Sequence, residues 1–266
     1  MDYFKADIEK NKRRELEQLM QDWKNEISTK GQIIFPDDNK SYDAIEYFNS
    51  DGFFPGYYSA EKKVLFIGRE SRYNSTYYTN GDRITTELER FNKNMNPNTS
   101  SYWRRILYIT YGIKNKGCLQ YADLPSAKEI LSEMIKANNY GFAIMNISKY
   151  SNDSVDGATA DFKLINRFLK DSILDKRNFI KEEIELLSPD IIITANLWDG
   201  NIDNYELEKV FPNSQFELQD AKKGIASFWN FTLGDRNIQF IDTWHLSKMG
   251  SDEKLFYNPV MEFLFK

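Results

Sequence analysis

The chain has few of the residues that bind metals or form disulfides. Its 266 residues include one cysteine, Cys118, and one histidine, His245. A single cysteine excludes an intrachain disulfide and any four-cysteine zinc or iron–sulfur site. These two residues cannot supply an ordinary zinc site, and no cluster of carboxylates suggests a site for a harder cation. We therefore expect neither a metal nor a cofactor.

Long apolar runs are also missing. No run approaches the roughly 18 to 20 residues of a membrane span. The first residues, MDYFKADIEKNKRRELEQ, lack the apolar centre of a signal peptide. The sequence therefore predicts a cytoplasmic protein with no membrane partner.

Basic residues are outnumbered by acidic ones. The 35 lysines and arginines face 40 aspartates and glutamates, giving a net charge of −5 and a pI of about 5.2. This balance argues against a large non-specific nucleic-acid surface, which is normally basic. It leaves room for a local basic groove, because charges beyond the Debye length of a phosphate are screened.

The order of apolar segments predicts the fold. Three short, continuous apolar runs are typical of strands that are buried on both faces: VLFIG, GFAIMNI and DIIITAN. Two further strands are expected around the turn GDRN, in IASFWNFTL and IQFIDTWHL. Helical periodicity falls between and around them, at 5–28, 101–113, 126–139, 160–187, 203–210 and 252–265. Alternating strands and helices predict a three-layer α/β/α fold with a central, mainly parallel sheet.

The chain reads as a single α/β domain over residues 1–266. We expect a helical extension at 1–50, a core at 53–250 and a closing helix at 251–266. Ser126 and Glu129 have the spacing of a capping box at a helix start. Residues 71–100 are polar and predict a weakly structured, mobile segment at the border of a ligand site.

Polar residues follow the expected strands. The first run ends in Gly68-Arg69-Glu70-Ser71, and the second contains Asn146 before Ser148 and Lys149. The third run ends at Asn196. The last ends in Asp242, Trp244, His245 and Ser247. Ligands of open parallel sheets bind outside the carboxyl ends of the strands. The sequence therefore predicts that Glu70, Asn146 and His245 line one pocket at that edge.

This pattern resembles the uracil-DNA glycosylase superfamily over roughly residues 53–250. VLFIGRES looks like the first motif of that family, and SYWRRILYITYGI is similar to a following helix with Trp-Arg. FAIMNISK resembles the second strand of the family, whose Asn reads the base edge. EEIELLSPDIIIT resembles the family's segment of helix, Pro and third strand. TWHLS stands at the place of the final His-Pro-Ser motif. The chain departs from the family where Glu70 replaces Asp and where Leu246 replaces Pro.

The resemblance implies metal-independent hydrolysis of the N-glycosidic bond of a deaminated or damaged pyrimidine that is flipped out of DNA. It makes Glu70 and His245 the catalytic residues. The substrate-binding residues that it implies are Gly68, Arg69, Ser71, Asn146, Ser148 and Ser247. The DNA-binding residues that it implies are Arg72, Lys149, Lys248 and Met249, with Met249 or Leu246 as the wedge that replaces the flipped base.

Two other functions fit parts of the sequence. IGRES and DTWHLSKMG resemble the nucleophile block and the Asp-x-x-His block of GDSL/SGNH-type esterases, with Ser71 as nucleophile, His245 as base and Asp242 orienting it. The first block is one residue longer than in that family, and a Gly-x-Asn-Asp block is missing. The third possibility is a non-catalytic binder of nucleic acid or nucleotide on a glycosylase-like fold.

Overall fold

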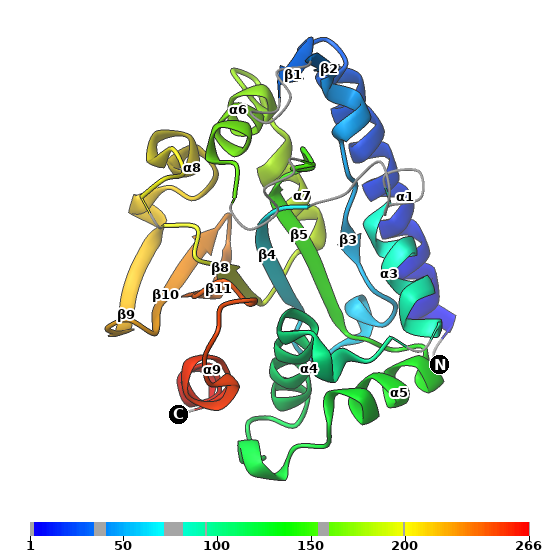
Figure 1. The fold of residues 1–266 in the computed structure, drawn as a ribbon, viewed down its shortest axis with the longest axis vertical. Helices are drawn as coiled ribbons and strands as arrows, with labels where there is room; N and C mark the ends of the chain where they lie inside the picture. Colours follow the sequence, from blue (N-terminus) through cyan, green and yellow to red (C-terminus); the bar gives the residue numbers. More distant parts are fainter. Residues whose placement is uncertain are drawn as a thin grey trace.

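A seven-stranded sheet forms the centre of the protein. The computed structural model describes residues 3–34, 41–71, 82–93, 95–153, 160–198 and 200–265. Within these ranges the strand order is β3-β5-β4-β8-β11-β10-β9 (Figure 1). Four adjacent strands are parallel: β5 (Phe142–Ser148), β4 (Val64–Glu70), β8 (Ile191–Ala195) and β11 (Arg236–Thr243). Three antiparallel strands extend the sheet: β3 (Gly52–Phe53), β10 (Ala226–Leu233) and β9 (Phe216–Lys222).

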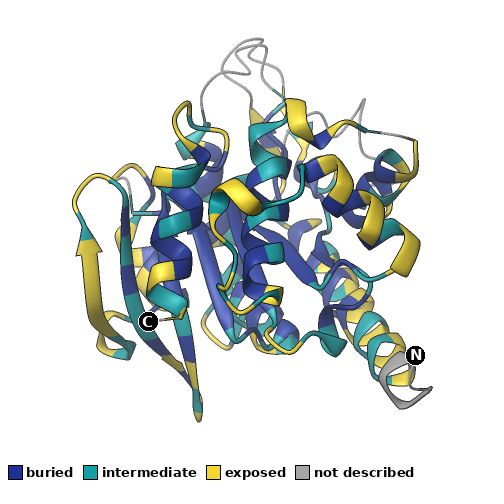
Figure 2. Cartoon of the chain, turned by 90° about the horizontal axis from the view of Figure 1, so that it is seen from below, coloured by how far each residue is buried: buried dark blue, intermediate teal, exposed yellow. Residues whose placement is uncertain are grey.

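Side chains of the central strands alternate between two cores. Leu65 and Ile67 of β4 belong to one apolar cluster, and Val64 and Phe66 belong to the other. Successive strand residues point to opposite faces, so a strand buried on both faces is continuously apolar. The parallel strands at the centre of the sheet are accordingly the most deeply buried part, whereas the edge strand β9 is largely exposed (Figure 2). The predicted α/β architecture with a sheet covered on both faces is confirmed at this level.

Helices cover both faces. One face carries α1 (Tyr3–Ile27), α6 (Phe162–Ser172), α7 (Phe179–Leu187) and α8 (Asn204–Val210). The other face carries α3 (Arg83–Asn92), α4 (Ser101–Lys114), α5 (Ala127–Ala137) and α9 (Asn258–Leu264), which continues a π-turn at Glu253–Tyr257. Two small strand pairs lie outside the sheet: β1 (Gln32–Ile34) with β2 (Ser41–Asp43), and β6 (Ile173–Leu174) with β7 (Arg177–Asn178). Short 3-10 turns occur at Ala44–Tyr47, Tyr57–Ser59, Pro97–Thr99, Tyr121–Asp123 and Asn213–Gln215.

The N-terminal helix is part of the core rather than an appendage. Trp23 of α1 has no exposed surface and stacks on Phe179 of α7, with the ring centroids 5.5 Å apart. Its indole N–H donates to Ser172 Oγ at 3.0 Å. In the described ranges, no helix is both long enough and apolar enough to span a bilayer.

The polar segment 71–100 is more ordered than its composition indicates. Helix α3 begins at the N-cap Asp82, whose side chain accepts from the N–H groups of Ile84 and Thr85. Ile84 and Phe91 are buried, at helical spacing. The expectation of weak structure is therefore wrong for this part, because a few well-spaced apolar residues suffice to dock a helix. Residues 72–81 lie outside the described residues, and the expected mobility stays a prediction. The capping box of Ser126 and Glu129 is confirmed.

Candidate functional site

The polar strand ends meet at one edge of the sheet. Glu70 is the last residue of β4, Asn146 lies near the end of β5, and His245 follows the end of β11. These strands are parallel members of one sheet, so their carboxyl ends share an edge. The predicted common edge is therefore confirmed. A common pocket stays a prediction, because residues 72–81 and 154–159, which follow two of these strand ends, lie outside the described residues.

Gly68 makes room for the Asn146 side chain. The two residues are register partners on β4 and β5. A Cβ atom on Gly68 would lie 2.5 Å from Asn146 Oδ1, closer than real Cβ contacts allow. The backbone N–H of Asn146 donates to Asp51 Oδ2 at 2.6 Å, and the residue is only 4% exposed. The main chain at Asn146 is thus fixed by Asp51, and its carboxamide occupies the space that a side chain at position 68 would fill.

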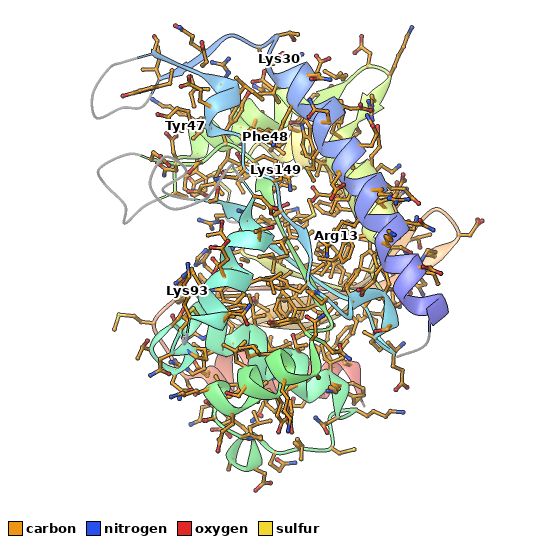
Figure 3. The ribbon with its side chains drawn as sticks, turned by 90° about the vertical axis from the view of Figure 1, so that its right-hand side faces the viewer. Arg13, Lys30, Tyr47, Phe48, Lys93 and Lys149 are labelled. Carbon is orange, nitrogen blue, oxygen red and sulfur yellow. The ribbon has the colours of Figure 1, made fainter. Side chains whose placement is uncertain are left out.

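Lys149 is not a DNA-contacting residue in this structure. It has no exposed surface and pairs with the Asp51 carboxylate, while its Nζ lies 2.7 Å from Glu183 Oε2 and donates to the Asn146 carbonyl at 3.2 Å. It lies in the interior near Phe48 (Figure 3). Burial raises the pKa of Glu183 well above its ordinary value, which favours its neutral form, and the nearby Lys149 ammonium opposes this shift. The prediction is wrong because partners distant in sequence neutralise the lysine.

His245 is held in one orientation by its own turn. Its Nδ1 accepts the backbone N–H of Ser247 at 3.2 Å, and its carbonyl accepts the N–H of Lys248 at 2.7 Å. A ring nitrogen that accepts a hydrogen bond carries no proton, so the neutral imidazole has its proton on Nε2. The turn therefore presents an N–H donor on the other side of the ring. Ser247 is exposed and acts on the site through its backbone.

Arg105 holds the segment that carries His245. This α4 side chain is 2% exposed. Its guanidinium donates to the carbonyls of Leu246, Lys248 and Gly250 at 2.6, 2.7 and 3.2 Å. Nε donates to Asp252 Oδ1 at 2.7 Å. Sequence reasoning missed this role, because an arginine on a helix is normally taken as solvated; the only signal was its place within the Trp-Arg-Arg helix.

The same segment separates the two candidate wedge residues. Leu246 is 2% exposed and packs in the core, so the expectation that it inserts into DNA is wrong. Met249 is 93% exposed. The wedge role of Met249 stays a prediction.

Two of the three serines predicted to contact substrate are buried. Ser71 is 4% exposed, and its Oγ accepts from Asn49 Nδ2 at 2.6 Å. Ser148 has no exposed surface, and its hydroxyl has no hydrogen-bond partner among the described residues. A ligand contact by Ser148 finds no support in this placement, because the side chain does not reach the surface.

Two of the predicted basic residues lie at the edge. Arg69 donates from Nη2 to the Asn196 carbonyl at 2.8 Å, with its guanidinium 5.1 Å from the centroid of the Phe162 ring. Lys248 places Nζ 2.8 Å from the centroid of the Trp244 ring. Both side chains are partly exposed. Arg72 lies outside the described residues.

Asp242 does not orient His245. Its Oδ1 accepts from Thr194 Oγ1 at 2.5 Å and from the N–H of Leu197 at 3.2 Å. Burial raises the pKa of Asp242 to about 6, against the lowering effect of these bonds and of Arg69. An esterase triad needs the aspartate to accept a hydrogen bond from His245 Nδ1–H, but that nitrogen is itself an acceptor here. Asp242 and His245 are therefore not arranged as the Asp–His pair that the esterase hypothesis requires.

Within the ranges that the structure describes, no group of three or more histidine, cysteine, aspartate or glutamate side chains is placed to hold a metal ion.

No family model matches the chain, and no curated protein and no solved structure does either.

Proposed function

We propose that the protein is a divergent uracil-DNA glycosylase-like hydrolase, which cleaves the N-glycosidic bond of a deaminated or damaged pyrimidine flipped out of DNA. The observation that carries the proposal is the close packing of Asn146 on Gly68, at the sheet edge that also bears Glu70 and His245. Of the five resembling segments, VLFIGRES, FAIMNISK and TWHLS lie at the carboxyl ends of β4, β5 and β11, EEIELLSPDIIIT leads into β8 between β4 and β11, and SYWRRILYITYGI forms α4. This arrangement supports the resemblance in a way that no single motif does.

Asn146 recognises the base in this proposal. A carboxamide offers one acceptor and two donors, which match the alternating acceptor and N–H of a pyrimidine edge. Its fixed position matters because recognition by hydrogen bonds loses discrimination when the reading group can rotate or shift. The backbone bond to Asp51 fixes the main chain at Asn146, and the missing side chain of Gly68 leaves room for the carboxamide beside β4.

His245 stabilises the departing base. Cleavage leaves negative charge on the base, and this charge is delocalised onto a carbonyl oxygen attached to the ring. The Nε2–H donor, oriented in advance by the Ser247 N–H on the opposite nitrogen, meets that charge without reorganisation. One such preorganised donor is typically worth about 2.7 to 4 kcal/mol in the transition state.

Glu70 acts on the sugar side of the bond. Its carboxylate orients the attacking water or stabilises the positive charge that develops on the sugar. Glutamate is one methylene longer than the aspartate of the family, so the backbone of Glu70 must lie slightly farther from the sugar to place the carboxylate at the same point. Arg69 and Lys248 contact phosphates at the mouth, which is compatible with a net charge of −5 because only nearby charge acts on them.

The proposal is tested by incubating the full chain with oligonucleotides that each contain one modified pyrimidine, in single and double strands. Abasic sites are scored by strand cleavage in alkali. We expect excision from at least one substrate, unaffected by chelator. Saturable binding of the oligonucleotides without any abasic site would favour the non-catalytic binder instead.

A further inference from the structure

A pocket of about 450 Å³ opens beside the site described above, at the carboxyl ends of β8 and β11 and against the β9–β10 hairpin. This is the side of the sheet drawn at the left of Figure 1. Its volume lies in the range of about 300 to 1,000 Å³ that small-molecule sites occupy. The proposed excision site makes no use of this space, since its recognising residue, Asn146, lies on the other side of β4 in the sheet order.

Aromatic rings form the walls of the pocket. Trp198, Trp229 and Trp244 line it, three of the five tryptophans in the chain. The other two, Trp23 and Trp103, are buried in the two cores. The three pocket tryptophans are partly exposed. Partly exposed tryptophans that gather around one cavity are a surface on which a flat ligand stacks.

Two of these rings have a fixed position. Trp244 donates its indole N–H to the Gly224 carbonyl at 2.7 Å, which ties the ring to the β9–β10 turn. Trp229 packs edge-on against Phe216, with the ring centroids 6.0 Å apart. The walls are therefore set by the protein before a ligand enters.

The inner end of the pocket is polar. Asp242 and Ser227 lie opposite each other on β11 and β10, and both line the cavity together with Asn196. The Asp242 carboxylate accepts hydrogen bonds from Thr194 Oγ1 and from the backbone N–H groups of Asn196 and Leu197, which fix its position at this end of the pocket. A carboxylate, a hydroxyl and an amide at one end of an aromatic slot match a planar ring that carries both N–H donors and carbonyl acceptors on its edge.

The outer end of the pocket is basic. Lys222 and Lys223 line it at the end of β9 and the start of the turn. Lys223 is exposed, and Lys222 pairs with Glu262 on the surface. A cationic mouth selects ligands with an anionic group outside the aromatic slot.

We propose that this pocket binds one unpaired nucleotide, with the base stacked on the exposed tryptophan surface, its polar edge toward Asp242 and Ser227, and its phosphate at Lys222 and Lys223. A sugar would satisfy the aromatic and polar parts but would make no use of the positive charge at the mouth, where Lys223 is exposed. An apolar ligand would leave the polar end unsatisfied. The nucleotide is the ligand class that uses all three parts.

The inference concerns binding alone and does not depend on base excision. It is tested by isothermal titration of the full chain with thymidine 5′-monophosphate, thymidine, inorganic phosphate and a short oligothymidylate. None of these is a damaged base, so the result is independent of any cleavage. We expect the monophosphate to bind more tightly than thymidine or phosphate. If both nucleotide ligands bind, the pocket accepts a nucleotide that is either free or part of a strand. If the monophosphate binds and the oligothymidylate does not, the pocket is restricted to free nucleotides.

Two variants locate the binding. Trp229→Leu is expected to raise the Kd for the nucleotide about 5- to 150-fold, the range for losing one base–aromatic stack. The surface pair Lys222→Gln and Lys223→Gln, which leaves the core untouched, is expected to weaken the monophosphate and not thymidine. The matched control is Lys114→Gln with Lys116→Gln, which makes the same charge change away from this pocket.

The inference is overturned by any of three results. The first is no saturable heat with either nucleotide ligand. The second is inorganic phosphate or thymidine binding as tightly as the monophosphate. The third is nucleotide affinity that is the same in the wild type, in the Lys222 and Lys223 variant and in the control.

Discussion

Replacing Arg105 by methionine removes the guanidinium that holds the segment around His245 and keeps much of the apolar bulk. The wild-type side chain is 2% exposed and donates to three backbone carbonyls of residues 246–250 as well as to Asp252. After the substitution these carbonyls lose a charged donor in a place that water reaches poorly. The Asp252 carboxylate, whose side chain is 7% exposed, keeps only its second partner, Arg104.

The magnitude follows from what is left unpaired. Removing one member of a buried ion pair typically costs about 3 to 5 kcal/mol, because the other charge stays in the interior. The contact with Arg104 offsets part of this, and the carbonyls that lose a donor add to it at about 1 to 3 kcal/mol for each group that water cannot reach. We therefore expect Arg105→Met to lower the free energy of unfolding by about 3 to 5 kcal/mol.

Arg104→Met is the matched control. Arg104 pairs with the same carboxylate from the next position of α4, but its side chain is 26% exposed, and its other described bond goes to the Asn98 carbonyl outside the segment. Its removal leaves Asp252 with Arg105, so we expect a loss of about 1 kcal/mol or less. Urea unfolding followed by circular dichroism measures both variants. Equal losses for the two variants, or a loss under 1 kcal/mol for Arg105→Met, would refute the reasoning.

Two further predictions concern single side chains at the sheet edge. The pKa of Asp242 is raised from 3.8 to about 6, so the folded state binds its proton more tightly than the unfolded state and loses stability as the pH rises from about 4 to 6. Asp242→Asn keeps an oxygen for Thr194 and removes this pH dependence. The free energy of unfolding of the variant, relative to the wild type, should therefore rise by up to about 3 kcal/mol from pH 4 to pH 7.5 in urea unfolding; a difference between variant and wild type that is equal at both pH values would disprove this. Gly68→Ala should cost about 1 to 3 kcal/mol of stability by crowding Asn146. The same change should cost much less in an Asn146→Ala background, and additive losses in the double variant would show that the two residues do not interact.

Local pattern was enough to find the layers of the fold. The runs at β4, β5 and β8 are continuously apolar because both of their faces are covered, and that burial is visible in the sequence itself. The edge that carries Glu70 and His245 followed from strand direction alone. Helix α3 was missed because its two buried apolar residues, Ile84 and Phe91, stand among many polar ones.

The sequence did not reveal which side chains pair with residues far away along the chain. Lys149 follows a strand end as a phosphate-binding lysine would, and only the folded chain brings Asp51 and Glu183 to it from 98 and 34 positions away. Arg105 lies 141 positions from the first carbonyl that it holds. Single-sequence patterns report what a residue does within its own element, and they carry no information on such partners.

The most direct test of the account compares His245→Ala with Ser71→Ala in single-turnover excision of the preferred modified base. His245→Ala removes the donor for the departing base and should slow excision by about 10² to 10³. Ser71→Ala should change the rate little, because no serine nucleophile takes part. The account would be contradicted if no oligonucleotide gained an abasic site while the protein cleaved a small acyl ester and lost that activity with Ser71→Ala.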